Sequence, residues 1–328
     1  MAMTMLISDL AVVMNLMAIA LLAFFVGAVL LSFTWLLLGR FVGLYSTGSQ
    51  KVLIWTWMLG PWFLGLMTML ILSPLFEQTE LYGLIESLAH WHHLYVFQLN
   101  SWHGISVILF VVFSFGLIVI KGSQVYRQNN ALYTLKHFST SQHSCGETQK
   151  VLIIDSDVPT AFTSGLFSPI CYVSKGLVDK LSPAELNIVI EHELAHARNK
   201  DPLFMLLIAC LSAYYPNKLA LLLNAKYRLM TEHVADQSTV LKHSAEDVAA
   251  TILKVVRLQK SLSVKESGAY LCYFGANDIT QRIQQLLQPT KKPIPMIIPV
   301  AFMLVMLCLN IVAVDATHHL VESVFTHY

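Results

Sequence analysis

Charged side chains are scarce in this chain. Lys, Arg, Asp and Glu make up 12% of its 328 residues, whereas hydrophobic residues make up 55%. A soluble globular domain carries about 25% charged residues. The composition therefore excludes an ordinary soluble domain unless its core is unusually large. The positions of the few charges decide between a large core and a membrane.

Four long stretches contain no charged residue at all. They cover residues 10–39, 52–76, 87–120 and 293–314. A helix of about 20 apolar residues crosses the hydrocarbon core of a bilayer, so each stretch is long enough. The alternative for any one of them is a buried core helix. Because residues 91–100 are aromatic and polar, we expect spans at about 10–38, 52–75, 101–120 and 293–314.

Positive charge is absent from three of the five segments that lie before, between and after these spans. Of the 21 Lys and Arg residues, Arg40 and Lys51 lie between the first two spans, and all others lie within 121–292. The positive-inside rule therefore places region 121–292 in the cytoplasm and both termini outside it. We expect a multi-pass protein of the bacterial cytoplasmic (inner) membrane. Met1 to Ser8 lack Lys and Arg, so we do not expect a cleaved signal peptide.

Cysteine is also sparse, with five residues in the chain and no CxxC pair. This spacing excludes a disulfide framework and suits a reducing compartment.

Region 121–292 has the length of one domain. Its pattern predicts a mostly helical fold with a small sheet. Strands are expected at 151–155 and on both sides of a turn in 161–174, and helices at 183–198, 203–215, 220–241, 244–259 and 278–287. The apolar segment before Pro216 is too short to cross a bilayer and would separate His192 from Glu232 if it did. We interpret it as a core or interfacial helix; the sequence leaves open whether residues 203–223 enter the membrane.

The helix expected at 183–198 carries a motif with chemical meaning. It starts with Ser182 as N-cap, proline at the first helical position and Glu185 three residues after the cap. His192 and His196 are four residues apart, so they share one face and can bind one zinc ion. Glu193 lies between them and can take a proton from a zinc-activated water. The sequence predicts a zinc hydrolase with Glu193 as general base.

A catalytic zinc needs a third protein ligand. The expected helix at 220–241 offers Glu232, His233 and Asp236. In a His₂Glu set, Glu232 would bind the metal, and Asp236 would accept a hydrogen bond from the outer nitrogen of a ligand histidine. His233 is the alternative ligand. A simpler interpretation is that both carboxylates pair with nearby basic residues on a solvated face.

Proteases often bind substrate as an added strand at a sheet edge. The segment with Ala161, Phe162, Thr163 and Gly165 is our candidate for that edge. The alternative is an ordinary core strand.

The segment from Gly165 to Leu203, together with Glu232 and Asp236, resembles the membrane zinc peptidases of the BlaR/MecR antirepressor type. The resemblance implies a mainly α, polytopic protein with a cytoplasmic α+β, gluzincin-like peptidase domain between the third and fourth spans. It implies one zinc ion on His192, His196 and Glu232. It also implies signal transduction by cleavage of the chain itself or of a cytosolic repressor. Only Asp315–Tyr328 follow the last span, so we do not expect the penicillin-binding sensor domain of the best-known members.

Other functions and partners remain open at this stage. One is an HtpX-type quality-control peptidase, which shares the motif from His192 to His196 and the pair Glu232 and Asp236. Another is a catalytically silent scaffold that keeps zinc for structure, in which His233 would be a fourth ligand. The expected partners are a protein substrate, the lipid bilayer and a second copy of the chain, with no direct nucleic acid binding.

Histidine is concentrated in the segments expected outside the cytoplasm. Seven of the 13 histidines lie there: His90, His92, His93, His103, His318, His319 and His327. Imidazole binds zinc and copper and titrates near neutral pH. One hypothesis is that this face senses a metal or pH. The alternative is the usual enrichment of polar and aromatic groups at a membrane interface.

Overall fold

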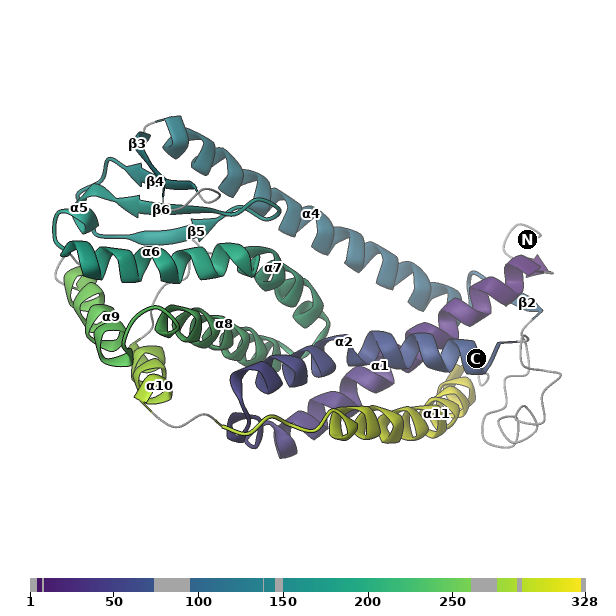
Figure 1. Cartoon of the computed structure of the whole chain (residues 1–328). Helices are drawn as coiled ribbons and strands as arrows, with labels where there is room; N and C mark the ends of the chain where they lie inside the picture. The colour runs from purple at the N-terminus through teal and green to yellow at the C-terminus, as the bar shows by residue number, and fades with distance from the viewer. Residues whose placement is uncertain are drawn as a thin grey trace.

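The computed structural model describes residues 5–7, 9–73, 95–137, 139–144, 150–260, 276–287 and 291–325. The molecule is elongated (Figure 1). A bundle of long helices forms one end and carries both chain termini at its tip, while a sheet covered by shorter helices forms the other end. His90, His92, His93 and His327 lie outside the described residues.

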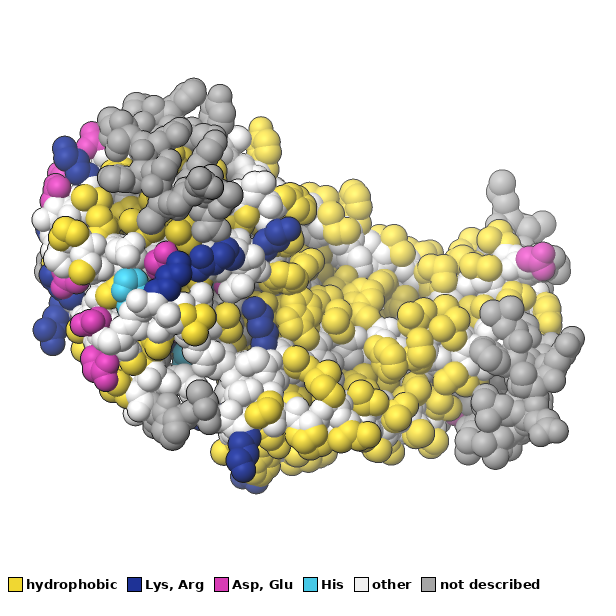
Figure 2. Space-filling view, viewed as in Figure 1, with side chains coloured by type: hydrophobic (Ala, Val, Ile, Leu, Met, Phe, Trp, Pro, Cys, Tyr) yellow, Lys and Arg dark blue, Asp and Glu magenta, His cyan; other side chains and the backbone are white. Residues whose placement is uncertain are grey.

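Among the residues that the structure describes, four helices are long and apolar enough to cross a membrane: α1 (Asp9–Leu38), α2 (Thr47–Ile71), α4 (Trp102–His137) and α11 (Ile297–Phe325). Many of their large apolar side chains face outward, as in Leu36 and Ile118 at 77% and 69% exposure. In Figure 2 hydrophobic side chains cover this part of the molecule, and Lys and Arg gather toward the opposite end. These features support the predicted multi-pass membrane protein. Two helices exceed the expected spans, because α4 continues past residue 120 and α11 continues past Val314.

Small and polar residues bring three of these helices together. A side chain at Gly65 of α2 would come within 2.7 Å of the Ala20 carbonyl of α1, so glycine permits close contact there. Asn310 of α11 donates to the Ala23 carbonyl at 3.0 Å and accepts from Thr68 at 3.2 Å. Helix α4 stands apart and contacts α1 near Val107.

Short elements join the long helices. Strands β1 (Met5–Ile7) and β2 (Val96–Gln98) pair antiparallel at the end of the bundle that carries the termini, and η1 (Val42–Leu44) lies between α1 and α2.

The sheet of the second part has the order β3-β4-β6-β5. Its strands are β3 (Ser139–Ser144), β4 (Lys150–Ile154), β5 (Ala161–Ser164) and β6 (Ile170–Ser174). Only the β4–β6 pair is parallel, and β5 is an outer strand. The expected turn in 161–174 contains Gly165 with φ +114°, a conformation that favours glycine. Strand β3 was not expected, because its sequence STSQHS lacks the apolar alternation of a strand.

Helices cover one face of this sheet (Figure 1). They are α5 (Lys175–Val178), α6 (Pro183–Arg198) and α9 (Ala245–Lys260), whereas α10 (Ala276–Leu287) lies farther from the sheet and packs against α9. Helix α6 contacts β5 and β6, and its Leu194 packs with Val173 and Val255 in a small core.

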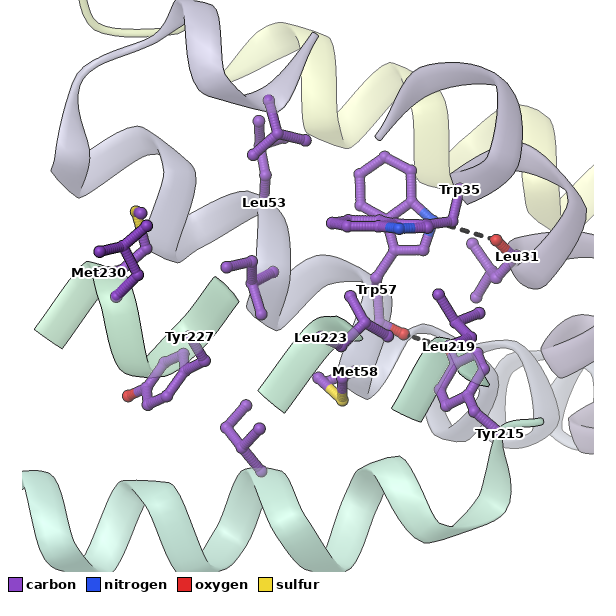
Figure 3. Packing of buried hydrophobic residues seen from close by; sticks show 14 of the residues in the cluster. Leu31, Trp35, Leu53, Trp57, Met58, Tyr215, Leu219, Leu223, Tyr227 and Met230 are labelled. Carbon is purple, nitrogen blue, oxygen red and sulfur yellow. Dashed lines mark hydrogen bonds between the residues drawn. The ribbon is translucent and has the colours of Figure 1, made fainter. Parts of the chain in front are cut away.

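The remaining elements form what we call the hairpin: α7 (Asp201–Leu211), η3 (Ser212–Tyr214) and α8 (Asn217–Val240). Its apolar side chains share one core with the long helices. Figure 3 shows Leu219, Leu223 and Tyr227 of α8 beside Leu53, Trp57 and Met58 of α2. The Tyr215 hydroxyl donates to the Trp57 carbonyl. The region expected to form one cytoplasmic domain therefore packs partly inside the helix bundle.

The tip of the hairpin reaches the middle of the bundle. The Tyr214 ring lies 5.5, 5.2 and 5.5 Å from the rings of Phe24, Trp62 and Phe110, each near the centre of an apolar span. Its hydroxyl is 2.8 Å from the Ser114 hydroxyl. Leu221, close to the tip, is 65% exposed. Spans that cross a bilayer would thus carry the tip into the bilayer, deeper than the interfacial position that its length suggests.

Candidate metal centre and active site

Helix α6 holds two histidines in a common orientation. Both arms of its capping box form, with Glu185 accepting from the Ser182 backbone at 2.8 Å. His192 and His196 are buried, and their Nε2 atoms are 3.2 Å apart. Two ligands on a tetrahedral zinc with bonds of about 2.0 Å lie about 3.3 Å apart. The two imidazoles therefore have the separation of a zinc-binding pair.

Helix α8 brings Glu232 to the same point. Its Oε2 is 3.4 Å from His192 Nε2, and its Oε1 is 3.7 Å from His196 Nε2. One atom from each of the three residues lies within 4.8 Å of the others, a group that can hold a metal ion. His233, the alternative ligand, is buried one residue further along but is not part of the group found among the described residues.

The outer nitrogen of each histidine meets a carboxylate. His192 Nδ1 is 3.0 Å from Asp236, and His196 Nδ1 is 2.8 Å from Asp201. Such contacts fix the imidazole with its proton outside and its Nε2 lone pair toward a metal. The sequence predicted this role for Asp236 but not for Asp201, which precedes the helix expected at 203–215. Lys200, in the turn between α6 and α7, has a φ of +53°. This turn brings Asp201 back to His196.

Arg282 of α10 is the second residue that sequence reasoning missed. Its guanidinium binds both oxygens of Asp236, at 2.8 and 2.6 Å, and lies 2.9 Å from Glu232. The whole residue is 1% exposed. The basic partner of these carboxylates is therefore a buried arginine from another helix, and not a nearby basic residue on a solvated face.

The protonation of the site follows from these contacts. Burial lowers the pKa of His192, but hydrogen bonds to Asp236 and Glu232 outweigh burial and raise it to about 9. Burial raises the pKa of Glu232, but Arg282 and His192 lower it to about 2. Asp236 likewise has a pKa well below its usual range because Arg282 outweighs burial. Both carboxylates are thus anionic at neutral pH.

Strand β5 touches the residue expected to act as base. The Thr163 hydroxyl lies 2.7 Å from the Glu193 carbonyl and 2.9 Å from the Glu193 carboxylate. In the part of the chain that the structure describes, no strand pairs with the other side of β5. The predicted edge segment therefore lies directly beside the histidine pair. Phe162 faces the opposite way and stacks on Tyr172.

A mainly apolar pocket opens next to this edge. Its wall includes Glu193 and His192, and Ala161 at the start of β5. The rest of the lining is Ile188, Val189, Val248, Thr251, Ile252, Val255, Gln259 and Arg282. A second pocket lies at the other end of β5, between α4 and α7, and is lined by Gln128, Gly165 and Met205 among others.

Comparison with known proteins identifies the family of this chain. The model of the BlaR1 peptidase M56 family matches residues 81–286. The chain belongs to the M56 peptidase family. This membership supports a membrane metallopeptidase and implies a metal, for which the two histidines and Glu232 are a suitable donor set.

Other relatives match this M56 peptidase over shorter stretches. The chain is 41% identical over 66 residues to "Protease HtpX homolog 2" of Methanosarcina mazei, which covers 20% of this chain and 22% of that protein. It is 38% identical over 78 residues to "Protease HtpX homolog" of Bacteroides fragilis, covering 23% and 24%. The chain thus spans about a quarter or less of these relatives. The crystal structure of S. mikatae Ste24p matches 55% of this chain and 56% of its own, with 15% identity and a TM-score of 0.32.

Proposed function

We propose that the chain is a zinc endopeptidase with His192, His196 and Glu232 as ligands and Glu193 as general base. The observation that carries the proposal is the convergence of the two Nε2 atoms and one carboxylate, while Asp236 and Asp201 bind the outer nitrogens. Three protein ligands leave a fourth position open, which favours catalysis over a closed structural site.

The chemistry is hydrolysis of a peptide bond. When bound, zinc supplies a Lewis acid that activates water and polarises the substrate carbonyl. Glu193 takes a proton as the water oxygen adds to the carbonyl carbon, and it passes a proton to the amine as the C–N bond breaks. Thr163 holds the Glu193 side chain in place for both transfers. Arg282 keeps the Glu232 carboxylate ionised and aimed at the metal position.

The substrate in this proposal is an extended peptide segment. It would add to the free side of β5, where Ala161 and Thr163 face α6, and cross directly over Glu193. One of its side chains would enter the pocket lined by Val189, Val248 and Ile252, which favours an apolar residue next to the cleaved bond.

The role that we propose is regulatory cleavage of the chain itself or of a cytosolic repressor. Membership of the BlaR1 family supports this role. The second candidate is quality control of membrane proteins, which the HtpX homologues favour through their matching segments. In both cases the peptidase acts at the cytoplasmic face of the inner membrane.

The decisive experiment compares the N-terminal peptides of cells expressing the wild type, Glu193→Gln and Glu191→Gln. Glu193→Gln keeps the proposed ligands and removes the base. Glu191→Gln is the matched control, because Glu191 lies on the same helix but pairs with Lys242 away from the site.

We expect cleavage products in the wild type and in Glu191→Gln that are absent in Glu193→Gln. One cut in the chain itself or in a small DNA-binding protein supports regulation, whereas many cuts in membrane proteins support quality control. Identical peptides in all three strains, under conditions where the wild type is purified with zinc, would contradict a peptidase and favour the scaffold.

A further inference from the structure

A second group of potential metal ligands lies at the opposite end of the molecule. His318, His319 and Glu322 stand on the last turns of α11, and one ligand atom of each lies within 4.8 Å of the others. His318 is 3% exposed, although α11 ends near the tip of the bundle (Figure 1). Its Nε2 is 3.3 Å from the Glu322 carboxylate.

A second helix contributes to this group. The first turn of α4 places His103 with its ring centroid 5.6 Å from that of His318. The Trp102 ring stacks on His103 at 3.8 Å and lies 5.8 Å from His318. Imidazoles from both α4 and α11 therefore lie close together, and the Trp102 ring packs beside them.

Ion pairs within one helix do not account for this arrangement. His318 pairs with Glu322 and His319 with Asp315, each four residues apart on α11. These pairs do not explain why ligand atoms of both histidines lie within 4.8 Å of a ligand atom of Glu322. They also do not explain why a third imidazole, from α4, lies beside His318. Imidazole and carboxylate together suit Zn²⁺ or Cu²⁺ better than Mg²⁺ or Ca²⁺, which prefer oxygen ligands alone.

The exposure of the group suggests how it would hold an ion. The His318 side chain is 4% exposed and fixed, whereas those of Glu322 and His319 are 31% and 49% exposed. Ligands on a bound zinc lie about 3.3 Å apart, so the two exposed side chains must turn inward by a small distance. Solvent can reach the site, so an ion would exchange freely with the surroundings.

We propose that His318, His319 and Glu322, with His103 alongside, form a second, exchangeable site for Zn²⁺ or Cu²⁺ at this end of the bundle. A bound ion that also takes His103 as a ligand would fasten the end of α11 to the first turn of α4. Helix α4 continues from there as one rod to β3 of the peptidase sheet. The site is thus placed to report the metal outside the membrane to the peptidase, in the topology that we propose.

The test is a zinc count on the full-length Glu193→Gln protein purified in detergent, which cannot cleave itself. After equilibrium dialysis against micromolar Zn²⁺, we expect two zinc ions per chain. The double variant His319→Ala/Glu322→Gln should bind one, and its two changes fall on partly exposed side chains and spare the fold. His243→Ala, in the peptidase part, is the control and should still bind two.

A single zinc per chain that the double variant retains would overturn the proposal. Two zinc ions that are unaffected by the double variant would overturn it as well. The count requires no cleavage, so a protein that proves inactive as a peptidase but loses one ion in the double variant would still carry this second site.

Discussion

At the scale of single residues, Arg282 is the charge on which the metal centre depends. It is the buried cation between two carboxylates, one proposed as a ligand and the other as the support of His192. Removing one member of a buried ion network leaves the others without a partner, which costs about 3–5 kcal/mol.

We therefore expect Arg282→Met to lower stability by about 3–5 kcal/mol and to reduce zinc occupancy. Arg282→Lys, which keeps the charge but not the two-pronged contact, should fall between it and the wild type. Thermal unfolding and metal analysis in detergent measure both effects. Arg198→Met removes an exposed partner of Glu191 and is the control, with an expected loss of about 1 kcal/mol or less. Equal stability of the two methionine variants would contradict this role.

The raised pKa of His192 leads to a pH dependence of metal binding. Without metal, His192 has a pKa of about 9 in the folded chain against 6.5 ordinarily. Its ion pairs therefore stabilise the metal-free fold fully below pH 6.5, and this contribution is lost as the pH rises through 9. Zinc must displace that proton, so zinc affinity should rise about tenfold per pH unit between about pH 7 and 9.

Competition with a chelator of known affinity, in the Glu193→Gln protein, measures this slope. An affinity that stays constant over this pH range would show that His192 is already neutral in the metal-free protein.

The sequence predicted only the part of the site that local spacing encodes. His192, Glu193 and His196 follow from one helical turn, and Glu232 and Asp236 from another. Arg282 is 46 residues from Asp236 and reaches it only through the packing of α10 on α8. Asp201 could not be predicted, because nothing in the sequence shows that the chain turns at Lys200 and brings Asp201 back onto His196.

At the scale of elements, the hairpin joins the membrane bundle to the metal centre. Asp201 stands at the start of α7, and Glu232 lies on α8. Both helices of the hairpin therefore connect its tip to the metal centre. The length of the apolar segment correctly predicted that α7 is too short to cross a bilayer. It did not predict the depth of the tip, which depends on aromatic contacts with three spans.

Truncating the tip should therefore disturb the distant site. We expect Tyr214→Ala to lower stability by about 3 kcal/mol, as for a large aromatic in a core, and to lower zinc occupancy. Tyr214→Phe loses only the contact with Ser114 and should cost about 1 kcal/mol. Unfolding temperatures and zinc content of the two variants give the comparison. Full zinc occupancy in a destabilised Tyr214→Ala protein would separate the tip from the site.

At the scale of the whole molecule, the four long helices match the charge-free stretches of the sequence, but the helix ends do not coincide with the ends of these stretches. Helices α4 and α11 run on where the chain turns polar, because helix propensity and packing continue after the apolar run stops. Which side each end faces is a prediction from the distribution of Lys and Arg alone.

Cysteine labelling of a chain without its native cysteines tests that prediction. A cysteine at Asp9, near the bundle tip, should react with a membrane-impermeant maleimide in intact spheroplasts. A cysteine at the exposed Lys180, near the start of α6, should react only after lysis. The reverse labelling pattern would contradict the proposed topology.

The core shared by the hairpin and the spans also governs when this protein becomes active during its synthesis. The first two spans leave the ribosome before α7 and α8, and the hairpin finds its apolar partners only once those spans stand side by side. Glu232 and Asp201 reach the histidine pair through the same packing. In the proposed topology and function, a chain that has not yet been inserted would lack an assembled metal centre and would be inactive in the cytosol.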